Sequence, residues 1–461
     1  MKEYPIMKRT PRIFIVTVVI LSALSFAAAQ EQKVERLDLS VDQAVKLGLE
    51  NSKGLHASSM KVEAANAKET EVKSSSLPSV KLNGSYTRLS EIPPFSFQLP
   101  IPGNPQTVTI SPSILNNYSM KLSVQQPIFT GFKLQGAADA AEYSARATEQ
   151  DFVKDKSELA YNVKNAYWTL YKANEFKKVI DETVDQVQAH LTDLTNLMKQ
   201  GMATNNDLLR VQVQLSNTKL LQIDATNNVQ LATIALDNVM GIPLSTDVHI
   251  TSVPTSAPDS GHVVPNLGPV ESYLSKAGQQ RSELKAMEFR VKAGEAGVTA
   301  AKGSWWPQIY FAGNYNYARP NSRIFPAVDE FKDTWDLSLV ASWDIWNWGA
   351  TPSQVTQASA QLVQTQDARQ QVQDAVTLEV TQNYLAVRQN ADRIGVSSDA
   401  VAQATENYRV TDQKFKGGLA LNSDLLDSEI SLMQARWNYT QALVEYELAQ
   451  ARLAKSAGDI Q

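Results

Sequence analysis

Two similar stretches of the chain end in charged residues whose spacing could form a binding site for ions. KQGMATNNDLL ends at Leu209, KGGLALNSDLL ends at Leu426, and seven of the eleven positions are identical. In the second stretch Asp424 is followed by Asp427. This i, i+3 spacing puts both carboxylates on one face of a helix. Two carboxylates that share a face attract cations and repel anions.

The equivalent positions of the first stretch carry charges of opposite sign. Asp207 matches Asp424, but Arg210 stands where the second stretch has Asp427. Asp–Arg pairs between the two stretches would hold together the helices that carry them. A second interpretation is that Asp207 and Asp424 only stabilise the first turn of their own helices, an effect of about 0.3–1 kcal/mol.

No other set of residues has the spacing of a catalytic or cofactor site. The sequence contains no G-x-x-x-x-G-K-[ST] phosphate loop, no G-x-G-x-x-G and no H-E-x-x-H. The four histidines are scattered without the spacing of metal ligands: His56, His190, His249 and His262. We therefore expect no enzyme activity, no cofactor and no metal site.

Charge and cysteine content narrow the class of protein further. The formal net charge is −5, which does not favour nucleic acid, because nucleic-acid binding normally requires a basic face. The chain has no cysteine. It is therefore expected to hold together without disulfides and to carry no lipid on an N-terminal cysteine.

The N-terminus has the pattern of a secretory signal peptide. Four basic residues precede the apolar run Ile13–Leu24, and Ala27, Ala28 and Ala29 provide a small-residue cleavage site. The run is shorter than the ~20 residues that a membrane-spanning helix needs. We expect residues 1–29 to be removed on export, which takes away four basic residues and one acidic residue and leaves a net charge of about −8. No apolar stretch of spanning length remains, so a membrane crossing would require strands.

The two matching stretches belong to a duplication of the whole exported chain. Tyr167 aligns with Tyr384 at the same offset as the two stretches, and upstream Pro78 aligns with Pro307 at a slightly larger one. The chain is therefore expected to divide into three parts after the signal peptide: a first repeat (30–241), a proline-rich linker (242–268) and a second repeat (269–461).

Each repeat contains two long segments that are almost free of glycine and proline, which predicts long helices. They are Ala137–Gln200 and Met202–Met240 in the first repeat, and Ser353–Lys416, interrupted only by Gly395, and Leu419–Ala457 in the second. Shorter helices are expected near Lys53–Ser76 and Ser282–Ser304. Helices this long exceed the usual range of soluble domains and indicate a coiled-coil-like assembly.

Two stretches in each repeat alternate apolar and polar residues with period two, which predicts strands. They lie near 78–90 and 117–128 in the first repeat, and near 306–318 and 334–346 in the second. The strands either form a soluble sheet with one face on a core, or cross a membrane with the apolar face toward lipid. Proline-rich loops, 92–112 and 320–326, join them at one end only.

Tryptophan placement favours the membrane interpretation. Six of the eight tryptophans lie at or beside strand ends, where membrane interfaces place them: Trp305, Trp306, Trp335, Trp343, Trp346 and Trp348. Four strands cannot close a barrel alone, because known barrels begin at about eight. An open edge in lipid is costly, so neighbouring chains must close it. Two chains would give eight strands and three would give twelve.

These features together resemble the TolC-like outer-membrane efflux proteins over Leu39–Gly458. The duplicated architecture, the corners QPIFTGF (Gln126–Phe132) and WDIWNWG (Trp343–Gly349), and the paired G-x-x-x-N-x-D-L-L tips carry the resemblance. The chain departs from lipid-anchored members, which carry an N-terminal cysteine.

The resemblance implies a mainly α-helical fold with a membrane β-barrel. Three identical chains would form a twelve-stranded barrel in the lipid of the outer membrane, continuous with a periplasmic α-helical barrel. It also implies the exit duct of a tripartite efflux pump or of a type I secretion system. The partners would be a periplasmic adaptor protein and an inner-membrane transporter, and the cargo, small molecule or polypeptide, stays open.

The resemblance also implies roles for the two tips. Three chains would place six hairpin turns in a ring at the periplasmic end, where small and apolar turn residues suit docking of an adaptor's helical hairpins: Gly201, Met202, Ala203, Thr204, Gly417, Gly418, Leu419 and Ala420. Gly201 and Gly418 are also expected to end the preceding helices. In family members, aspartates matching Asp424 and Asp427 ring the closed entrance, so these two residues, with Asp207 and Arg210, are the expected pore constriction.

A different class of protein shares many of these patterns. An exported coiled-coil spacer or adhesin with a β-anchor would have the same long helices and strands and would not conduct. It gives no reason for two matched hairpin tips.

Overall fold

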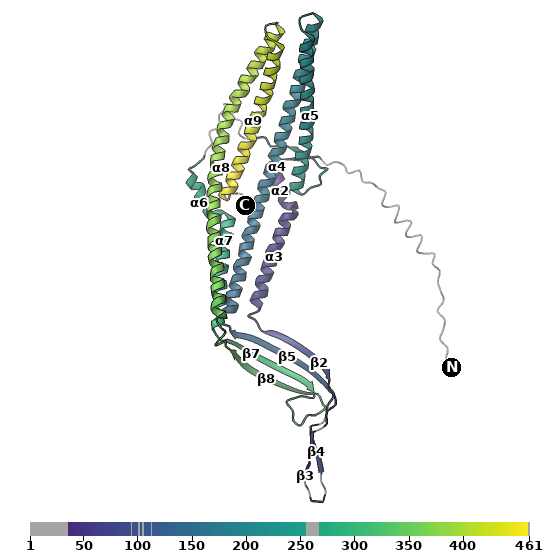
Figure 1. Ribbon diagram of the computed structural model, residues 1–461, viewed down its shortest axis with the longest axis vertical. Coiled ribbons are helices and arrows are strands. Elements are labelled where there is room, and N and C mark those ends of the chain that lie inside the picture. Colours follow the sequence, from purple (N-terminus) through teal and green to yellow (C-terminus); the bar gives the residue numbers. More distant parts are fainter. Residues whose placement is uncertain are drawn as a thin grey trace, which may run out of the picture.

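A computed structural model describes residues 36–93, 95–99, 102–103, 106–111, 113–254 and 267–459. The described chain is a long rod of helices that continues into a β-sheet at one end (Figure 1). The expected signal peptide, residues 1–29, lies outside the described residues.

Two antiparallel pairs of long helices form the rod. The first pair is α4 (Lys133–Lys199) with α5 (Asn205–Met240), and the second is α8 (Ala350–Lys416) with α9 (Asn422–Ala457). Both α4 and α8 have 67 residues, and both α5 and α9 have 36. The duplication therefore preserves helix length to the residue.

Helices α4 and α8 begin a few residues earlier than the glycine- and proline-free segments that predicted them, whereas α5 and α9 begin a few residues later. Helix α4 takes in Gly136, and α8 takes in Pro352 within its first turn, where a proline sacrifices no helical hydrogen bond. Gly395 is buried inside α8 and does not interrupt it. A glycine in a helix weakens it by only about 1 kcal/mol, which packing against a neighbour offsets.

Two shorter helices complete the rod in the half that adjoins the sheet. They are α3 (Lys53–Ser74) and α7 (Ser282–Lys302). Helix α4 contacts α5 and α9 in the half that holds the tips, and α3 and α7 in the other half, while α8 contacts α9 and α7. The helices therefore lie in the order α5–α4–α9–α8 near the tips and α3–α4–α7–α8 near the sheet (Figure 1).

The middle of the rod holds elements that the sequence patterns did not predict. They are the helices α2 (Val41–Asn51) and α6 (Val270–Gln280), and the parallel strands β1 (Arg36–Leu39) and β6 (Asp247–Ile250). Tyr167 of α4 anchors this region, because its hydroxyl donates to the Leu39 carbonyl at 3.0 Å and accepts the Ser252 N–H at 2.8 Å.

The junction before each shorter helix uses different chemistry in the two repeats. Ser52 caps α3, and its hydroxyl accepts the Leu55 N–H at 3.1 Å. The equivalent Arg281 is buried, and its guanidinium binds Glu283 at 2.9 Å and Glu379 of α8 at 2.6 Å. Burial opposes ionisation of Glu283, yet the Arg281 guanidinium holds the pKa of that carboxyl below its usual range.

The strands near the far end form one antiparallel sheet of order β2–β5–β7–β8. Its members are β2 (Ser79–Arg88), β5 (Asn116–Phe129), β7 (Gln308–Arg319) and β8 (Lys332–Ser342). The β5–β7 pairing joins the two repeats. Among the described residues, β2 and β8 each keep one unpaired edge.

The segment 92–112 was expected to be a loop, and that expectation was wrong. It contains the hairpin β3 (Phe95–Leu99) and β4 (Gln106–Ser111), which projects beyond the sheet (Figure 1). The many prolines of this segment led to the loop prediction, because proline cannot donate a hydrogen bond to a strand ladder.

Tight corners of one design lead from β5 into α4 and from β8 to α8. Gly131 and Phe132 are left-handed at φ +63° and +68°, and the equivalent Trp348 and Gly349 are left-handed at +56° and +82°. A Cβ on Gly131 would meet the Gly303 carbonyl oxygen at 2.4 Å, so this position also requires glycine for space.

None of the helices in the described part of the chain is long and apolar enough to cross a membrane.

Candidate functional site

The two hairpin tips have the same backbone geometry. Gly201 and Gly418 adopt φ values of +74° and +73°, after α4 and α8 respectively. The N–H that follows each glycine bonds back to the preceding helix, from Met202 to the Leu197 carbonyl and from Leu419 to the Lys414 carbonyl. This is the Schellman helix ending that a left-handed glycine permits, as expected for both positions. Met202 and Leu419 are exposed at the turns, whereas Ala203 and Ala420 are partly buried.

Asp207 and Asp424 cap the helices that leave the tips. The Asp207 carboxylate accepts the Thr204 N–H at 3.2 Å, and the Asp424 carboxylate accepts the Leu421 N–H at 3.1 Å. Both carboxylates therefore stabilise the first turn of their own helices, as the second interpretation of the sequence expects. Asp427 is one turn further on and makes no such bond among the described residues.

Arg210 and Asp427 line one groove between α5 and α9. The groove has a volume of about 420 Å³, and Leu209, Val213 and Leu426 supply its apolar wall. No ion pair joins Arg210 to Asp424 or Asp427 within the described chain. The structure thus brings the expected Asp–Arg partners to one surface without pairing them.

A contact that the sequence patterns missed joins the two hairpins just below the tips. Nδ1 of His190 on α4 lies 3.3 Å from Oε1 of Glu429 on α9, and both side chains are 2% exposed. Neither forms a hydrogen bond in the described structure. Phe415 packs on the imidazole at 5.1 Å between ring centroids. Burial raises the pKa of the nearby Tyr408 hydroxyl, and the negative charge of Glu429 raises it further.

The same α4–α9 seam continues toward the middle of the rod. Arg436 donates to Glu182 at 2.7 Å, and the next residue, Trp437, packs on Phe176 at 4.5 Å between ring centroids. These partners come from different repeats of the chain, so no local spacing could have indicated them.

The sheet has one apolar face and one polar face. Register places Leu82 beside Leu122, Leu122 beside Tyr315, and Tyr315 beside Trp335, so the apolar residues of all four strands share a face. The opposite face carries a row of serine and asparagine side chains with the lysines Lys81 and Lys121. All residues of β2 and most apolar residues of β8 are exposed. This alternation is that of a strand with lipid on one side and water on the other.

The six selected tryptophans lie at two levels of this sheet. Trp305, Trp306, Trp343, Trp346 and Trp348 cluster where the sheet meets the helices, and each is between 47% and 89% exposed. Trp335 lies inside β8 toward the far end, opposite Tyr315. The strand from Trp335 to Trp343 spans about 27 Å at the usual rise per residue. The apolar band of an outer-membrane barrel is about 25 Å tall.

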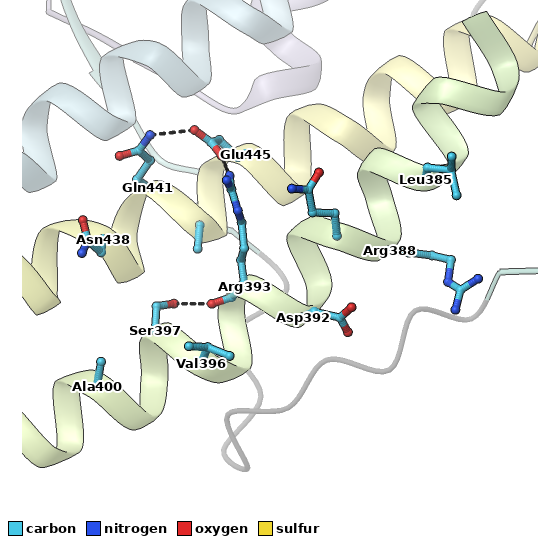
Figure 2. A pocket seen from close by; sticks show the side chains of 12 residues that line it. Leu385, Arg388, Asp392, Arg393, Val396, Ser397, Ala400, Asn438, Gln441 and Glu445 are labelled. Carbon is cyan, nitrogen blue, oxygen red and sulfur yellow. Dashed lines mark hydrogen bonds and ion pairs between the residues drawn. The ribbon is translucent and has the colours of Figure 1, made fainter. Parts of the chain in front are cut away.

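A groove between α8 and α9 was not expected from the sequence. Its volume is about 890 Å³. Figure 2 shows Arg393 of α8 reaching to Glu445 of α9, with a distance of 3.0 Å between Nη1 and Oε2. Leu385 and Val396 line the groove and are 55% and 74% exposed. Polar and charged side chains, among them Arg388 and Asp392, line much of the rest of the groove.

A metal site in the described residues would need several ligating side chains close together. No group of three or more His, Cys, Asp or Glu side chains there has the placement to hold a metal ion. Asp237 of α5 is fully buried and has no hydrogen-bond partner for its carboxylate in the described part of the chain, and this burial raises its pKa to about 6. It lies in the packed middle of the rod rather than in a cleft.

Comparison with known proteins identifies the family. The profile described as outer membrane efflux protein matches residues 44–242 and 273–459, which covers both repeats. The chain belongs to the outer membrane efflux protein family. The two matched segments correspond to the two structural copies that the tips, helices and strands reveal.

Relatives in the outer membrane efflux protein family cover most of the chain. The probable efflux pump outer membrane protein TtgC of Pseudomonas putida is 21% identical over 90% of this chain and 81% of its own. The proteases secretion protein PrtF of Dickeya chrysanthemi is 21% identical over 75% of this chain and 73% of its own.

Solved structures share the fold. CusC, described with its folding and transmembrane channel formation, superposes with a TM-score of 0.76 at 18% identity, covering 91% of this chain and 92% of CusC. The outer membrane protein VceC of Vibrio cholerae gives a TM-score of 0.74 at 16% identity, covering 91% of this chain and 96% of VceC.

Proposed function

We propose that three copies of this chain form a duct through the outer membrane, which serves as the exit of a tripartite efflux pump or type I secretion system. The observation that carries the proposal is the unfinished sheet. One face of the sheet is apolar and exposed, and the described strands β2 and β8 leave an edge open on either side. In lipid, each unpaired backbone group costs several kcal/mol, so only a closed barrel is stable there.

Neighbouring copies supply the closure. Strands β2 and β8 run in opposite directions, so β8 of one chain can pair antiparallel with β2 of the next, as every other pair in the sheet does. The helical layer ends at α8 on one side and at α3 and α5 on the other, on the same sides as the open strands. Three chains give a twelve-stranded barrel in line with a wall of long helices.

The orientation of the duct in the cell envelope follows from the position of the strands at one end of the helices. The sheet lies in outer-membrane lipid, the helices extend into the periplasm, and a cleaved signal peptide at residues 1–29 directs export. Relatives named for an efflux pump and for protease secretion support both kinds of cargo, small molecules and polypeptides. Cargo reaches the duct from an inner-membrane transporter through a periplasmic adaptor.

The tips form the periplasmic mouth. Their small and apolar residues, Gly201 to Thr204 and Gly417 to Ala420, dock the adaptor, because the glycines let a helix approach closely and Met202 and Leu419 offer it exposed apolar side chains. Asp427, with Asp424 one turn away, faces the groove that Arg210 shares. Three chains place six carboxylates around one axis, which favours cations at the constriction.

A planar bilayer separates this duct from the non-conducting spacer or adhesin. The purified protein is expected to give discrete conductance steps, and a spacer would give none. Asp424→Asn with Asp427→Asn is expected to lower the cation-to-anion permeability ratio about two- to fivefold, because six charges leave the mouth. Asp412→Asn is the matched control, since that aspartate forms an ion pair with Lys416 on α8, the helix that leads to the second tip. Unchanged selectivity in the double variant would remove both residues from the pore.

A further inference from the structure

The polar face of the sheet carries two lysines that have no acidic partner. Lys81 of β2 and Lys121 of β5 are both exposed, and neither forms an ion pair among the described residues. Register places Lys81 opposite Ser123, which is two residues along β5 from Lys121. Residues in this diagonal relation are about 7–8 Å apart. Because lysine ammonium groups sit on flexible stems, both can reach one ligand, and the two lysines form a basic patch.

The other charged residues of this face, on the four strands of the sheet, do not neutralise the basic patch. Lys332 of β8 forms an ion pair with Glu330 at 2.9 Å. Asp336 of β8 accepts a hydrogen bond from the side-chain amide of Asn314 at 2.8 Å. Strand β8 is the third strand from β2 and the second from β5, which places it about 10–14 Å from the strands of the basic patch at the usual strand spacing.

The duplication shows that the fold does not require lysine at these positions. The equivalents of Lys81 and Lys121 in the second repeat are Tyr310 and Ser338, which lie on the same polar face and carry no charge. The uncompensated positive charge is thus confined to the neighbouring strands β2 and β5 (Figure 1). In a ring of three chains it would recur as three separate patches.

A pocket adjoins the basic patch where the sheet meets the helices. Its volume is about 520 Å³, and Ser79, Gln125 and Tyr310 line it from the polar face. Ser79 comes two residues before Lys81, so the pocket begins about 7 Å from that lysine along the strand. The Gln125 side-chain amide offers two N–H donors to a ligand. The pocket has the volume of a small-molecule site, with a positive charge at one end.

We propose that the basic patch and the adjoining pocket bind the anionic group of cargo inside the duct, with one site in each chain. The proposal rests on the proposed function, which places the polar face of the sheet in the lumen. It adds a class of cargo, molecules that carry phosphate or carboxylate groups. The low-dielectric wall of the barrel concentrates such anions near the lysines. Because the acidic mouth repels anions, the site acts on cargo that the transporter has already driven past the mouth.

Calorimetric titration of the purified protein tests the site. Inorganic tripolyphosphate and citrate are the probes for phosphate and carboxylate groups, and maltotriose is a neutral control. The titration uses about 10 mM salt, where the Debye length is about 30 Å and charges are weakly screened. At least one anion is expected to bind with one molecule per chain, and maltotriose is expected not to bind. Lys81→Gln with Lys121→Gln is expected to weaken binding of that anion about tenfold, because the patch loses both charges.

Two further variants separate the basic patch from a general effect of charge on this face. Lys332→Gln removes a lysine of the same face that already has an acidic partner, and it is expected to leave the affinity nearly unchanged. Lys81→Arg with Lys121→Arg keeps both positive charges and is expected to bind the anion as the parent does. In a planar bilayer, the same anion is expected to lower the single-channel conductance of the parent more than that of the glutamine variant, because the site faces the lumen.

The outcomes distinguish the anion site from the duct. Conducting protein that binds neither anion, or a glutamine variant that binds as tightly as the parent, would overturn the site and leave the duct intact. An anion that binds at the lysines and changes the conductance of the parent and of the glutamine variant equally would overturn the lumenal position of the site. Protein that gives no conductance steps would contradict the duct itself, whether or not the anion binds.

Discussion

Replacing His190 with alanine is expected to lower the free energy of unfolding by about 3–5 kcal/mol, the range for breaking a buried ionisable pair by removing one partner. The Glu429 carboxylate would stay buried without the His190 imidazole beside it, and it has no hydrogen-bond partner in the described structure. Because the pair joins α4 to α9, the loss should appear as a lower denaturant midpoint of the helical signal, measured in detergent.

Two variants separate this pair from general effects. His56 is exposed on α3, so His56→Ala is expected to change the free energy of unfolding by less than about 0.5 kcal/mol. Glu429→Leu in the His190→Ala background is expected to recover much of the loss, because an apolar side chain has no charge to desolvate. Equal midpoints for His190→Ala and the parent would show that the two side chains do not stabilise the hairpin junction.

Replacing Gly418 with glutamate is expected to lower export of the pump's cargo at least tenfold while trimers still assemble. Gly418 is at the outermost turn, and a Cβ there would meet no atom of the described residues within 4 Å. Any loss would therefore come from a partner that the longer, charged side chain holds away. Export is measured in cells that carry the duct with its adaptor and transporter.

Gly418→Ala is the control for backbone strain. Both variants must place a Cβ at φ +73°, which costs about 1–2 kcal/mol. Only glutamate adds length and charge, so the alanine variant is expected to export nearly as well as the parent. Equal export by the two variants would mean that the adaptor docks elsewhere.

The sequence predicted what is periodic or repeated. Long segments without glycine or proline predicted the four long helices, and period-two alternation predicted β2, β5, β7 and β8, because both signals are local. The constant offset between the two repeats predicted that the copies would match, and α4 and α8 agree in length. The family resemblance, which rested on the tips and corners, was confirmed by the profile match.

What the sequence could not predict depends on distant partners. The helices α2 and α6 are each only 11 residues long, and Arg281, at the end of α6, binds residues that are distant in the sequence. Arg281 donates a hydrogen bond to Glu379 of α8, which follows the strands of the sheet in the sequence. His190 contacts Glu429 of α9, which belongs to the other helical hairpin. His190 was set aside because it has no neighbour with metal-ligand spacing, and spacing gives no information about a side chain buried against another helix.

The mass of the protein–detergent particle tests the central claim, that copies of this chain complete each other's sheet. Light scattering that separates protein mass from bound detergent is expected to give three chains per particle. Particles are also assembled from a mixture of two single-cysteine variants, Tyr86→Cys and Leu339→Cys. They are expected to cross-link between chains and never within one. A stable particle of one chain, with β2 and β8 still unpaired, would contradict the duct.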